Sequence, residues 1–113
     1  MNASEPSRGD VWDLDPTIGR EQAGARPALV LSVDLFNSGP ADLVVAIPIT
    51  RTERRVRWHV QIRPPEGGLV ADSFIQCENV RSVSKKRLRR QRGRISEDTM
   101  QQVEDRLRIL LGL

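Results

Sequence analysis

The fold is decided by one stretch of sequence, G-R-E-Q-A-G-A-R-P-A-L-V-L-S at residues 19–32, in which a polar, glycine-rich loop runs into an apolar strand. Gly19 and Gly24 permit backbone angles and close approaches that other residues resist, and Pro27 biases Arg26 towards an extended conformation. The apolar run after Pro27 indicates a strand buried on both faces of a sheet, or closed into a small barrel. The stretch therefore predicts a cation, Arg26, fixed at the mouth of a buried strand.

The length of 113 residues suits one domain and leaves little room for a second core. We expect a loose N-terminal arm over residues 1–7 and a single domain over residues 8–113. No apolar run is long enough to span a bilayer, and the lone cysteine, Cys77, can form neither an internal disulfide nor a zinc site. These features favour a cytoplasmic protein without a signal peptide, a metal or a cofactor.

Short apolar runs alternate with turn signals on both sides of the opening stretch. Strands are expected around residues 11–14, 28–33, 43–50, 58–62 and 92–95, with at least one more between 69 and 83. A helix is expected after the N-cap Ser96, with one apolar stripe formed by Met100, Val103, Leu107, Leu110 and Leu111 and an end at Gly112. The pattern predicts a mainly β fold of five or six short strands, a partly open small barrel with a C-terminal helix packed alongside.

The net charge of +3 conceals an uneven distribution. Residues 1–50 carry −4, residues 51–94 carry +9, and residues 95–113 carry −2. Two runs concentrate the positive charge: residues 51–57 hold four arginines, and residues 85–94 hold seven Lys or Arg. Such a segment attracts polyanions, so nucleic acid is the leading class of partner, and a solvated charged face is the alternative.

Several kinds of catalytic site are disfavoured by the residues present. The acidic residues are scattered rather than convergent, which argues against a metal-dependent nuclease. His59 is the only histidine, so a two-histidine acid–base mechanism is excluded, and on a strand it is more often a packed residue than a catalyst. Cys77 lies in an apolar strand, where an inert thiol is expected, and the glycine-rich loop lacks the Gly-Lys-Ser/Thr ending of a P-loop.

What remains is a phosphate site made by Arg26 and Thr50, with Glu21 in the loop as the nearby base. Such a set suits RNA, whose 2′-hydroxyl is a nucleophile already held beside the phosphate. Arg26 would stabilise developing negative charge, Thr50 would position the phosphate, and Glu21 would accept the proton. The alternative is that Glu21 and Arg26 form only an ion pair within the loop, and spacing alone favours that alternative.

Four motifs resemble the MazF/PemK family of toxin endoribonucleases over nearly the whole chain from Arg8. They are R-G-D-V-W at residues 8–12, D-L-D-P-T-I-G-R-E-Q-A-G-A-R-P-A-L-V-L-S at 13–32, I-P-I-T at 47–50, and D-S-F-I-Q-C-E-N-V-R-S-V-S-K-K-R-L at 72–88. The resemblance implies an SH3-like barrel of five to seven strands, shared with the CcdB gyrase poisons, and a homodimer. It also implies sequence-specific, metal-independent cleavage of single-stranded RNA to 2′,3′-cyclic phosphate and 5′-hydroxyl ends, and inhibition by a MazE-like antitoxin.

Matching the motifs residue by residue assigns roles to individual positions. The family's catalytic arginine, threonine and loop glutamate fall on Arg26, Thr50 and Glu21. RNA contacts fall on Ser73, Asn79 and Arg81, and the family often has glutamine at the position of Asn79. Lys85 and Arg87, in the basic segment that follows, are further candidates for RNA binding. We expect Arg51, Arg54 and Arg55, in the basic loop after Thr50, to select the RNA sequence.

Two other functions are compatible with a small basic barrel. A CcdB-like inhibitor of DNA gyrase would act through its C-terminal residues, and the ending Gly112-Leu113 offers no aromatic or polar group for such contacts. A non-catalytic RNA-binding barrel needs exposed aromatic side chains on which bases stack. The chain has no Tyr and only two Phe and two Trp, which favours the nuclease.

Overall fold

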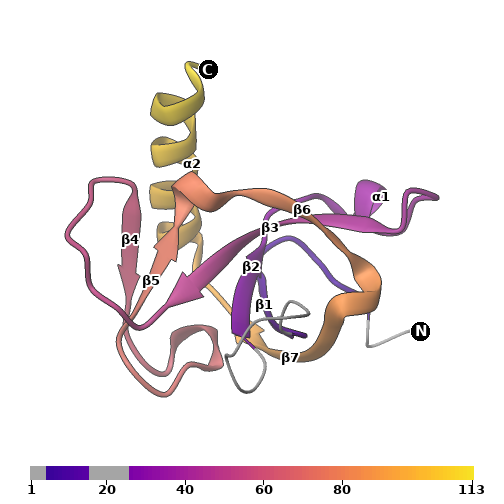
Figure 1. Ribbon diagram of the computed structural model, residues 1–113, viewed down its shortest axis with the longest axis horizontal. Helices are drawn as coiled ribbons and strands as arrows, with labels where there is room; N and C mark the ends of the chain where they lie inside the picture. The colour runs from indigo at the N-terminus through magenta and orange to yellow at the C-terminus, as the bar shows by residue number, and fades with distance from the viewer. Residues whose placement is uncertain (1–4, 16–25) are drawn as a thin grey trace.

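The computed structural model describes residues 5–15 and 26–113. Seven antiparallel strands are followed by a C-terminal helix (Figure 1). The strands are β1 Asp10–Leu14, β2 Arg26–Val30, β3 Leu43–Thr50, β4 His59–Ile62, β5 Ser73–Gln76, β6 Arg81–Ser84 and β7 Leu88–Arg94; the helices are α1 Asp34–Asn37 and α2 Glu97–Leu111; short 3-10 turns are η1 Glu66–Gly68, η2 Cys77–Asn79 and η3 Lys85–Arg87. The prediction of a mainly β fold with a C-terminal helix is confirmed. None of the helices in these two ranges is long and apolar enough to cross a membrane.

The long strand β3 joins the two halves of the sheet. The strand order is β4-β5-β3-β2-β1-β7, and β6 pairs with β3 off this path. The first half of β3 pairs with β6, from Leu43 opposite Ser84, and its last two residues pair with β5, ending with Thr50 opposite Phe74. β3 also pairs with β2, which places Pro48 opposite Ala28. This register places Thr50, the last residue of β3, at the end of the sheet where β2 begins.

Apolar side chains fill both faces of the central strands. Leu29 on β2 belongs to a core cluster that includes Val103 and Leu107 of α2, whereas Ala28 and Val30 belong to a second cluster with Trp12 of β1. Alternating side chains of one strand thus pack into two different cores, because successive residues of a strand point to opposite faces. The prediction that this strand is buried on both faces is confirmed.

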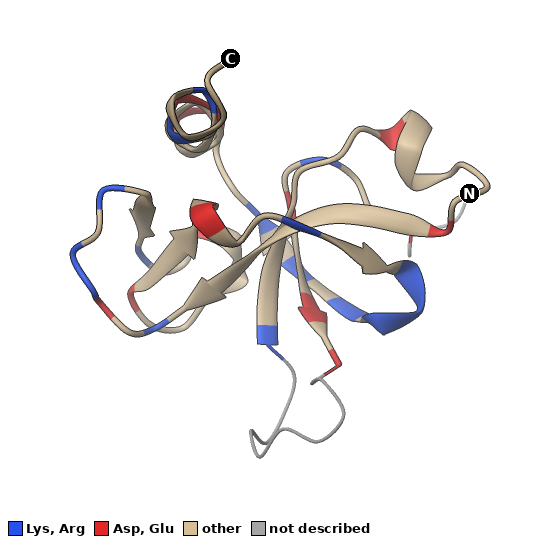
Figure 2. Ribbon diagram, turned by 45° about the horizontal axis from the view of Figure 1, so that its top comes forward, with Lys and Arg blue, Asp and Glu red and all other residues tan. Residues whose placement is uncertain are grey.

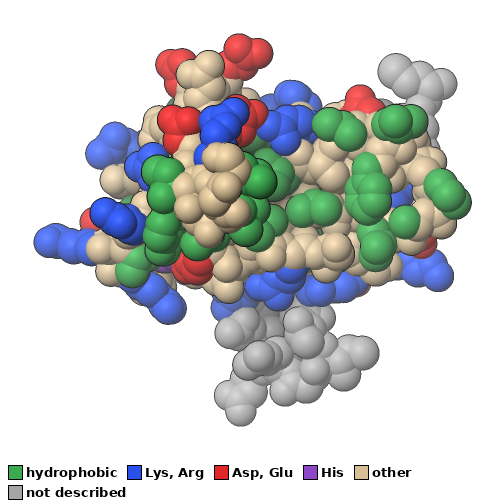
Figure 3. Space-filling model, turned by 90° about the horizontal axis from the view of Figure 1, so that it is seen from above, with side chains coloured by type: hydrophobic (Ala, Val, Ile, Leu, Met, Phe, Trp, Pro, Cys, Tyr) green, Lys and Arg blue, Asp and Glu red, His purple; other side chains and the backbone are tan. Residues whose placement is uncertain are grey.

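The helix α2 begins and ends as the sequence predicts. The Ser96 hydroxyl accepts a hydrogen bond from the Thr99 backbone N–H at 3.1 Å, and Gly112 ends the helix in the left-handed conformation at φ 72°. Of the predicted apolar stripe, Val103 and Leu107 are buried, Met100 and Leu110 are partly buried, and Leu111 is 57% exposed. The reason is geometric: the last turns of α2 extend beyond the sheet, and Figure 3 shows exposed apolar side chains around the free end of the helix.

One other segment differs from the sequence-based prediction. The strand expected to continue through Val33 stops at Val30, because the short helix α1 starts at Asp34 and turns the chain. Inside that turn the Asn37 side chain is buried, and its amide donates to the Ser32 carbonyl at 3.0 Å and to the Pro6 carbonyl at 3.2 Å. Residues 69–83, where at least one strand was expected, hold two strands, β5 and β6, separated by η2.

Residues 5–7 of the predicted N-terminal arm contact the barrel. Pro6 is buried, the Ser7 backbone N–H donates to the Asp10 carboxylate at 2.8 Å, and Glu5 pairs with Lys85 at 3.4 Å. The division of the chain at residue 8 stays a prediction.

Strand β1 carries acidic side chains that face the basic strand β7. Asp10 pairs with Arg94 at 2.5 Å, and Asp13 pairs with both Arg90 and Arg92, at 3.4 and 3.3 Å. Asp15, just after β1, pairs with Arg89. Figure 2 shows the Lys and Arg residues (blue) along η3 and β7. A large part of the positive charge that the sequence concentrates in residues 85–94 is therefore neutralised within the fold.

Candidate functional site

Two adjoining cavities meet at the start of β2. The first, of about 480 Å³, is lined by Leu14, Asp15, Arg26, Pro27, Ala28, Ala46, Pro48, Arg54, Gln76, Asn79, Arg81, Val83 and Arg87. The second, of about 440 Å³, is lined by Arg26, Pro27, Ile49, Thr50, Arg51, Thr52, Leu69, Val70, Ser73 and Arg92. Arg26 and Pro27 line both cavities. The cation singled out by the sequence thus lies where the two cavities join.

The pairing of β2 with its neighbours fixes the backbone of Arg26. Arg26 is the first residue of the strand and lies opposite Leu14 of β1, and Pro27 lies opposite Asp13. The Pro27 ring cannot supply a donor to a neighbouring strand, and it holds the preceding residue extended. The Arg26 side chain is consequently exposed at the open end of the strand.

The second cavity contains a hydroxyl that is ready to donate. The Thr50 Oγ1 accepts a hydrogen bond from the Thr52 backbone N–H at 3.1 Å, which leaves the hydroxyl proton available for a ligand. Ser73 is buried, and its hydroxyl donates to the Ala71 carbonyl at 2.9 Å, so this hydroxyl is already engaged within the protein. Arg51 follows Thr50 on the same wall of the cavity and is exposed.

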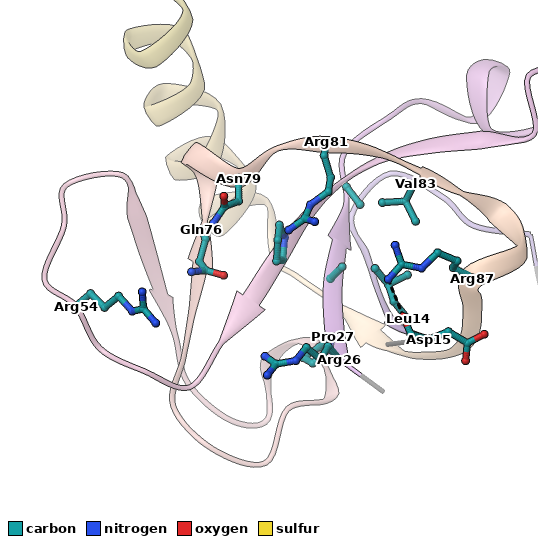
Figure 4. A pocket seen from close by; sticks show the side chains of 13 residues that line it. Leu14, Asp15, Arg26, Pro27, Arg54, Gln76, Asn79, Arg81, Val83 and Arg87 are labelled. Atoms are coloured by element: carbon teal, nitrogen blue, oxygen red, sulfur yellow. Dashed lines mark hydrogen bonds between the residues drawn. The ribbon is translucent and has the colours of Figure 1, made fainter. Parts of the chain in front are cut away.

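Cations from separate elements surround the first cavity. Figure 4 shows Arg81 extending from β6 into the cavity, Arg54 pointing toward it from the loop after β3, and Arg26 at the start of β2. Arg87 donates to the Asp15 carbonyl at 2.6 Å, which also ties η3 to the end of β1. The amide side chains of Gln76 and Asn79 supply neutral donors and acceptors on the same wall.

The cavities bring together most of the residues singled out in the sequence. Arg26, Thr50, Arg51, Arg54, Ser73, Asn79, Arg81 and Arg87 line one or both. Arg55 and Lys85 line neither: the Arg55 side chain is 86% exposed, and Lys85 pairs with Glu5. Glu21 lies outside the described residues.

The structure adds lining residues that the sequence did not single out. Gln76, Asp15 and Arg92 belong to the cavity walls. Gln76 lies within the fourth motif, three residues before Asn79, so the motif could have identified it as a candidate site residue. The sequence placed Arg92 only in a general basic run, and the structure shows that it lines the second cavity.

The other candidate groups for catalysis, His59 and Cys77, line neither cavity. The His59 Nε2 lies 2.9 Å from the Glu78 carboxylate, and its side chain is 4% exposed. Cys77 is fully buried, and this burial, together with the neighbouring Glu78 carboxylate, raises the pKa of its thiol to about 11. Cys77 therefore stays protonated at neutral pH and is a poor nucleophile, as the sequence predicts.

The chemistry available at the cavities is that of anion binding. Within the described ranges, Arg26, Arg51, Arg54 and Arg81 pair with no carboxylate, so their charge remains available. In the same part of the chain no three His, Cys, Asp or Glu residues cluster closely enough to hold a metal ion. Guanidinium groups and a free hydroxyl suit a phosphodiester, because they bind the phosphate oxygens and stabilise added negative charge.

Comparison with known proteins identifies the family. Three solved structures resemble the chain: an endoribonuclease in complex with its cognate antitoxin from a mycobacterial species (29% identity, TM-score 0.79, 96% of each chain covered), and MazE-MazF (30%, 0.80) and MazF alone (31%, 0.78) from Deinococcus radiodurans, each covering 96% of this chain and 97% of the other. A sequence model described as the PemK-like, MazF-like toxin of type II toxin-antitoxin systems matches residues 7–111. The chain therefore belongs to the family of PemK-like, MazF-like toxins of type II toxin-antitoxin systems.

Proposed function

We propose that this protein is an endoribonuclease toxin that cuts single-stranded RNA at specific sequences without a metal ion. The family supports the class of activity, since a structure that it resembles at 29% identity is named an endoribonuclease. The position of Arg26 carries the proposal for this chain, because Arg26 lies between two basic cavities, one of which also holds Thr50.

The proposed reaction is an attack of the ribose 2′-oxygen on the adjacent phosphorus. A base removes the 2′-hydroxyl proton, the new P–O2′ bond forms, and the P–O5′ bond breaks. The departing 5′-oxygen takes up a proton, so the products are a 2′,3′-cyclic phosphate and a 5′-hydroxyl. Arg26 neutralises the charge that develops on the phosphate oxygens, and the Thr50 hydroxyl donates a hydrogen bond to one of them.

The base in this proposal is Glu21, from the loop that precedes Arg26. Among the described residues, Asp15 is the sole carboxylate that lines either cavity, and it is paired with Arg89. An engaged carboxylate of this kind is poorly placed to accept a proton from substrate.

The first cavity is the proposed site of base recognition. Its amide side chains, Gln76 and Asn79, can bond to base edges exposed in single-stranded RNA. Arg54 enters the same cavity from the loop after β3 and contributes to the choice of sequence. Arg51 lines the second cavity, beside Thr50, and binds the backbone there.

We also propose that the protein acts as a homodimer in the cytoplasm and is neutralised by a MazE-like antitoxin. Two of the solved structures described above contain an antitoxin partner, which supports this regulation. An acidic antitoxin segment would compete with RNA for those cavity arginines that pair with no carboxylate in residues 5–15 and 26–113.

The direct test incubates purified protein with mixed RNA in EDTA and maps the ends that appear. We expect discrete cuts that leave 5′-hydroxyl and 2′,3′-cyclic phosphate ends. Intact RNA, or cutting that EDTA abolishes, would contradict the proposal.

Three variants separate the roles of Arg26 and Thr50 from folding. Arg26→Gln and Thr50→Val are each expected to lower the cleavage rate by about 10²-fold or more, a typical loss for a group that stabilises transition-state charge. Thr50→Ser keeps the hydroxyl and is expected to retain activity. The matched control is Arg63→Gln, at an exposed arginine that lines neither cavity. Full activity of Arg26→Gln would remove Arg26 from the site.

A further inference from the structure

Arg92 lines the second cavity but differs from the other arginines there because the protein holds it in place. Its side chain is only 17% exposed. One terminal nitrogen, Nη1, donates to Asp13 Oδ1 at 3.3 Å, and the other, Nη2, donates to the Gly68 carbonyl at 3.3 Å. Arg26 and Arg51, by comparison, are exposed residues of the same cavity.

The two groups that hold Arg92 are themselves packed closely against the sheet. Asp13 lies in the middle of β1 and is buried. Gly68 has a φ of +69°, and a Cβ added to it would lie 2.0 Å from the Arg92 carbonyl oxygen, so η1 packs directly on the backbone of β7. The partner strand thus holds one side of the guanidinium group, and η1 holds the other.

The binding capacity of Arg92 is not exhausted by these contacts. A guanidinium group has five N–H donors, and the two contacts use two of them. Asp13 is shared with Arg90, so the three side chains together carry a net positive charge. A group already held in one orientation loses less entropy when it binds a ligand.

We propose that Arg92 binds the RNA phosphate next to the one that is cut, and that Asp13 is the positioning residue that orients it. This inference rests on the proposed ribonuclease function. The scissile phosphate is assigned to Arg26 and Thr50, and Arg92 lies in the wall of the cavity that they share. A contact to a phosphate that does not react has equal strength in the ground state and the transition state, so it affects KM rather than kcat.

The test compares Arg92→Gln with Arg90→Gln. Both substitutions remove one positive charge from β7 and one partner from Asp13, but Arg90 is 72% exposed and lines neither cavity. Binding is measured on an RNA with a 2′-deoxy nucleotide at the cut site, over a range of salt concentrations. Each phosphate contact contributes about 0.7 to the slope of log affinity against log salt for single strands.

Arg92→Gln is expected to lower the magnitude of this slope by about 0.7 and to raise KM about tenfold, with kcat nearly unchanged. Arg90→Gln is expected to change the slope and KM much less. Asp13→Asn is expected to raise KM while the slope stays near the wild-type value, because Arg92 keeps its charge but loses its orientation. Equal slopes for Arg92→Gln and Arg90→Gln would overturn the inference.

Two controls keep these outcomes distinct. Arg92→Lys is the second variant, used if the melting temperature shows that Arg92→Gln fails to fold. Arg92→Lys keeps the charge, so it is expected to preserve the slope and to raise KM. If the wild-type protein neither binds nor cuts RNA, the proposed function itself fails. If the wild type cuts RNA but the Arg92 variants have the same salt slope and KM as Arg90→Gln, the inference about Arg92 fails and the proposed function stands.

Discussion

Asp10 is expected to be the side chain whose charge matters most for stability, and Asp10→Asn tests this. Its side chain is 3% exposed and accepts four hydrogen bonds. The Arg94 guanidinium (2.5 Å) and the Gln91 amide (3.1 Å) donate to Oδ1, while the Ser7 backbone N–H (2.8 Å) and the Trp12 indole N–H (3.2 Å) donate to Oδ2. A carboxylate is required here because all four partners are donors.

The cost of Asp10→Asn follows from this geometry. An asparagine has one oxygen, so in either orientation its NH₂ group faces two donors that then have no acceptor. Each donor left unpaired costs about 1–3 kcal/mol, least for the exposed Gln91 and Arg94, and two of them together give about 3 kcal/mol for the substitution. This is a large fraction of the roughly 5–15 kcal/mol by which a domain of this size is stable.

The assay is unfolding by urea at a fixed protein concentration, followed by the fluorescence of the two tryptophans, one of which is the buried Trp12. With a slope of about 1.5–2 kcal/mol per molar urea, the midpoint of Asp10→Asn is expected about 1.5–2 M below that of the wild type. Arg94→Gln is expected to cost less, about 1 kcal/mol, because Arg94 is 56% exposed and the carboxylate keeps three donors.

The control is Asp34→Asn, the same chemical change at an exposed carboxylate, which is expected to stay within about 0.5 kcal/mol of the wild type. A loss below about 1 kcal/mol for Asp10→Asn would refute the reasoning, since it would mean that the four contacts do not depend on the charge. An equal loss for Arg94→Gln would also refute it, because the exposed partner would then matter as much as the buried one.

Three further outcomes are expected. Cys77 should resist a thiol reagent at pH 8 until the protein unfolds. Its folded pKa of about 11 lies above the ordinary thiol value of 9.0, so the unfolded state loses this proton first and stability falls between about pH 9 and 11, by up to about 1.4 kcal/mol per pH unit. Cys77→Ala should remove that fall in urea titrations. Gly68→Ala should lower the melting temperature strongly because its Cβ would meet the backbone of β7. Gly112→Ala, at a similar positive φ but with nothing within 4 Å, carries only the backbone strain and should lower it less. Arg54→Gln should alter the set of RNA sequences that is cut, as mapped by sequencing of 5′-hydroxyl ends. Arg55→Gln should leave that set unchanged because Arg55 lines neither cavity, and the reverse result would contradict this assignment.

The parts of the fold that the sequence predicts well depend on local patterns. Continuous apolarity predicts the burial of β2 on both faces, and a good N-cap with an apolar stripe predicts where α2 starts and which face packs. The failures need long-range information. Leu111 has the right spacing for the stripe but lies beyond the sheet, and α1 depends on a buried Asn37 whose amide reaches Pro6.

The candidate site was predicted in part for the same reason. Arg26 and Thr50 stand at strand ends, and strand ends can be located from the pattern of apolar residues and turns. The run of Lys and Arg in residues 85–94 gives no indication of which cations meet a carboxylate, because that is decided by the register between β1 and β7. Lys85 is an example: it was expected to bind RNA, and it pairs with Glu5 of the N-terminal segment.

The pairing of β1 with β7 has a consequence for how the toxin finds its substrate. RNA in a cell offers far more places to adsorb than to be cut, and an unpaired cation on the outside of the barrel would hold RNA in orientations that lead to no product. By pairing Arg89, Arg90 and Arg94 with aspartates, the fold limits attraction at this surface. The pairs are thus expected to favour productive encounters, and removing Asp15, which frees Arg89, should slow turnover in crowded RNA while leaving the chemical step unchanged.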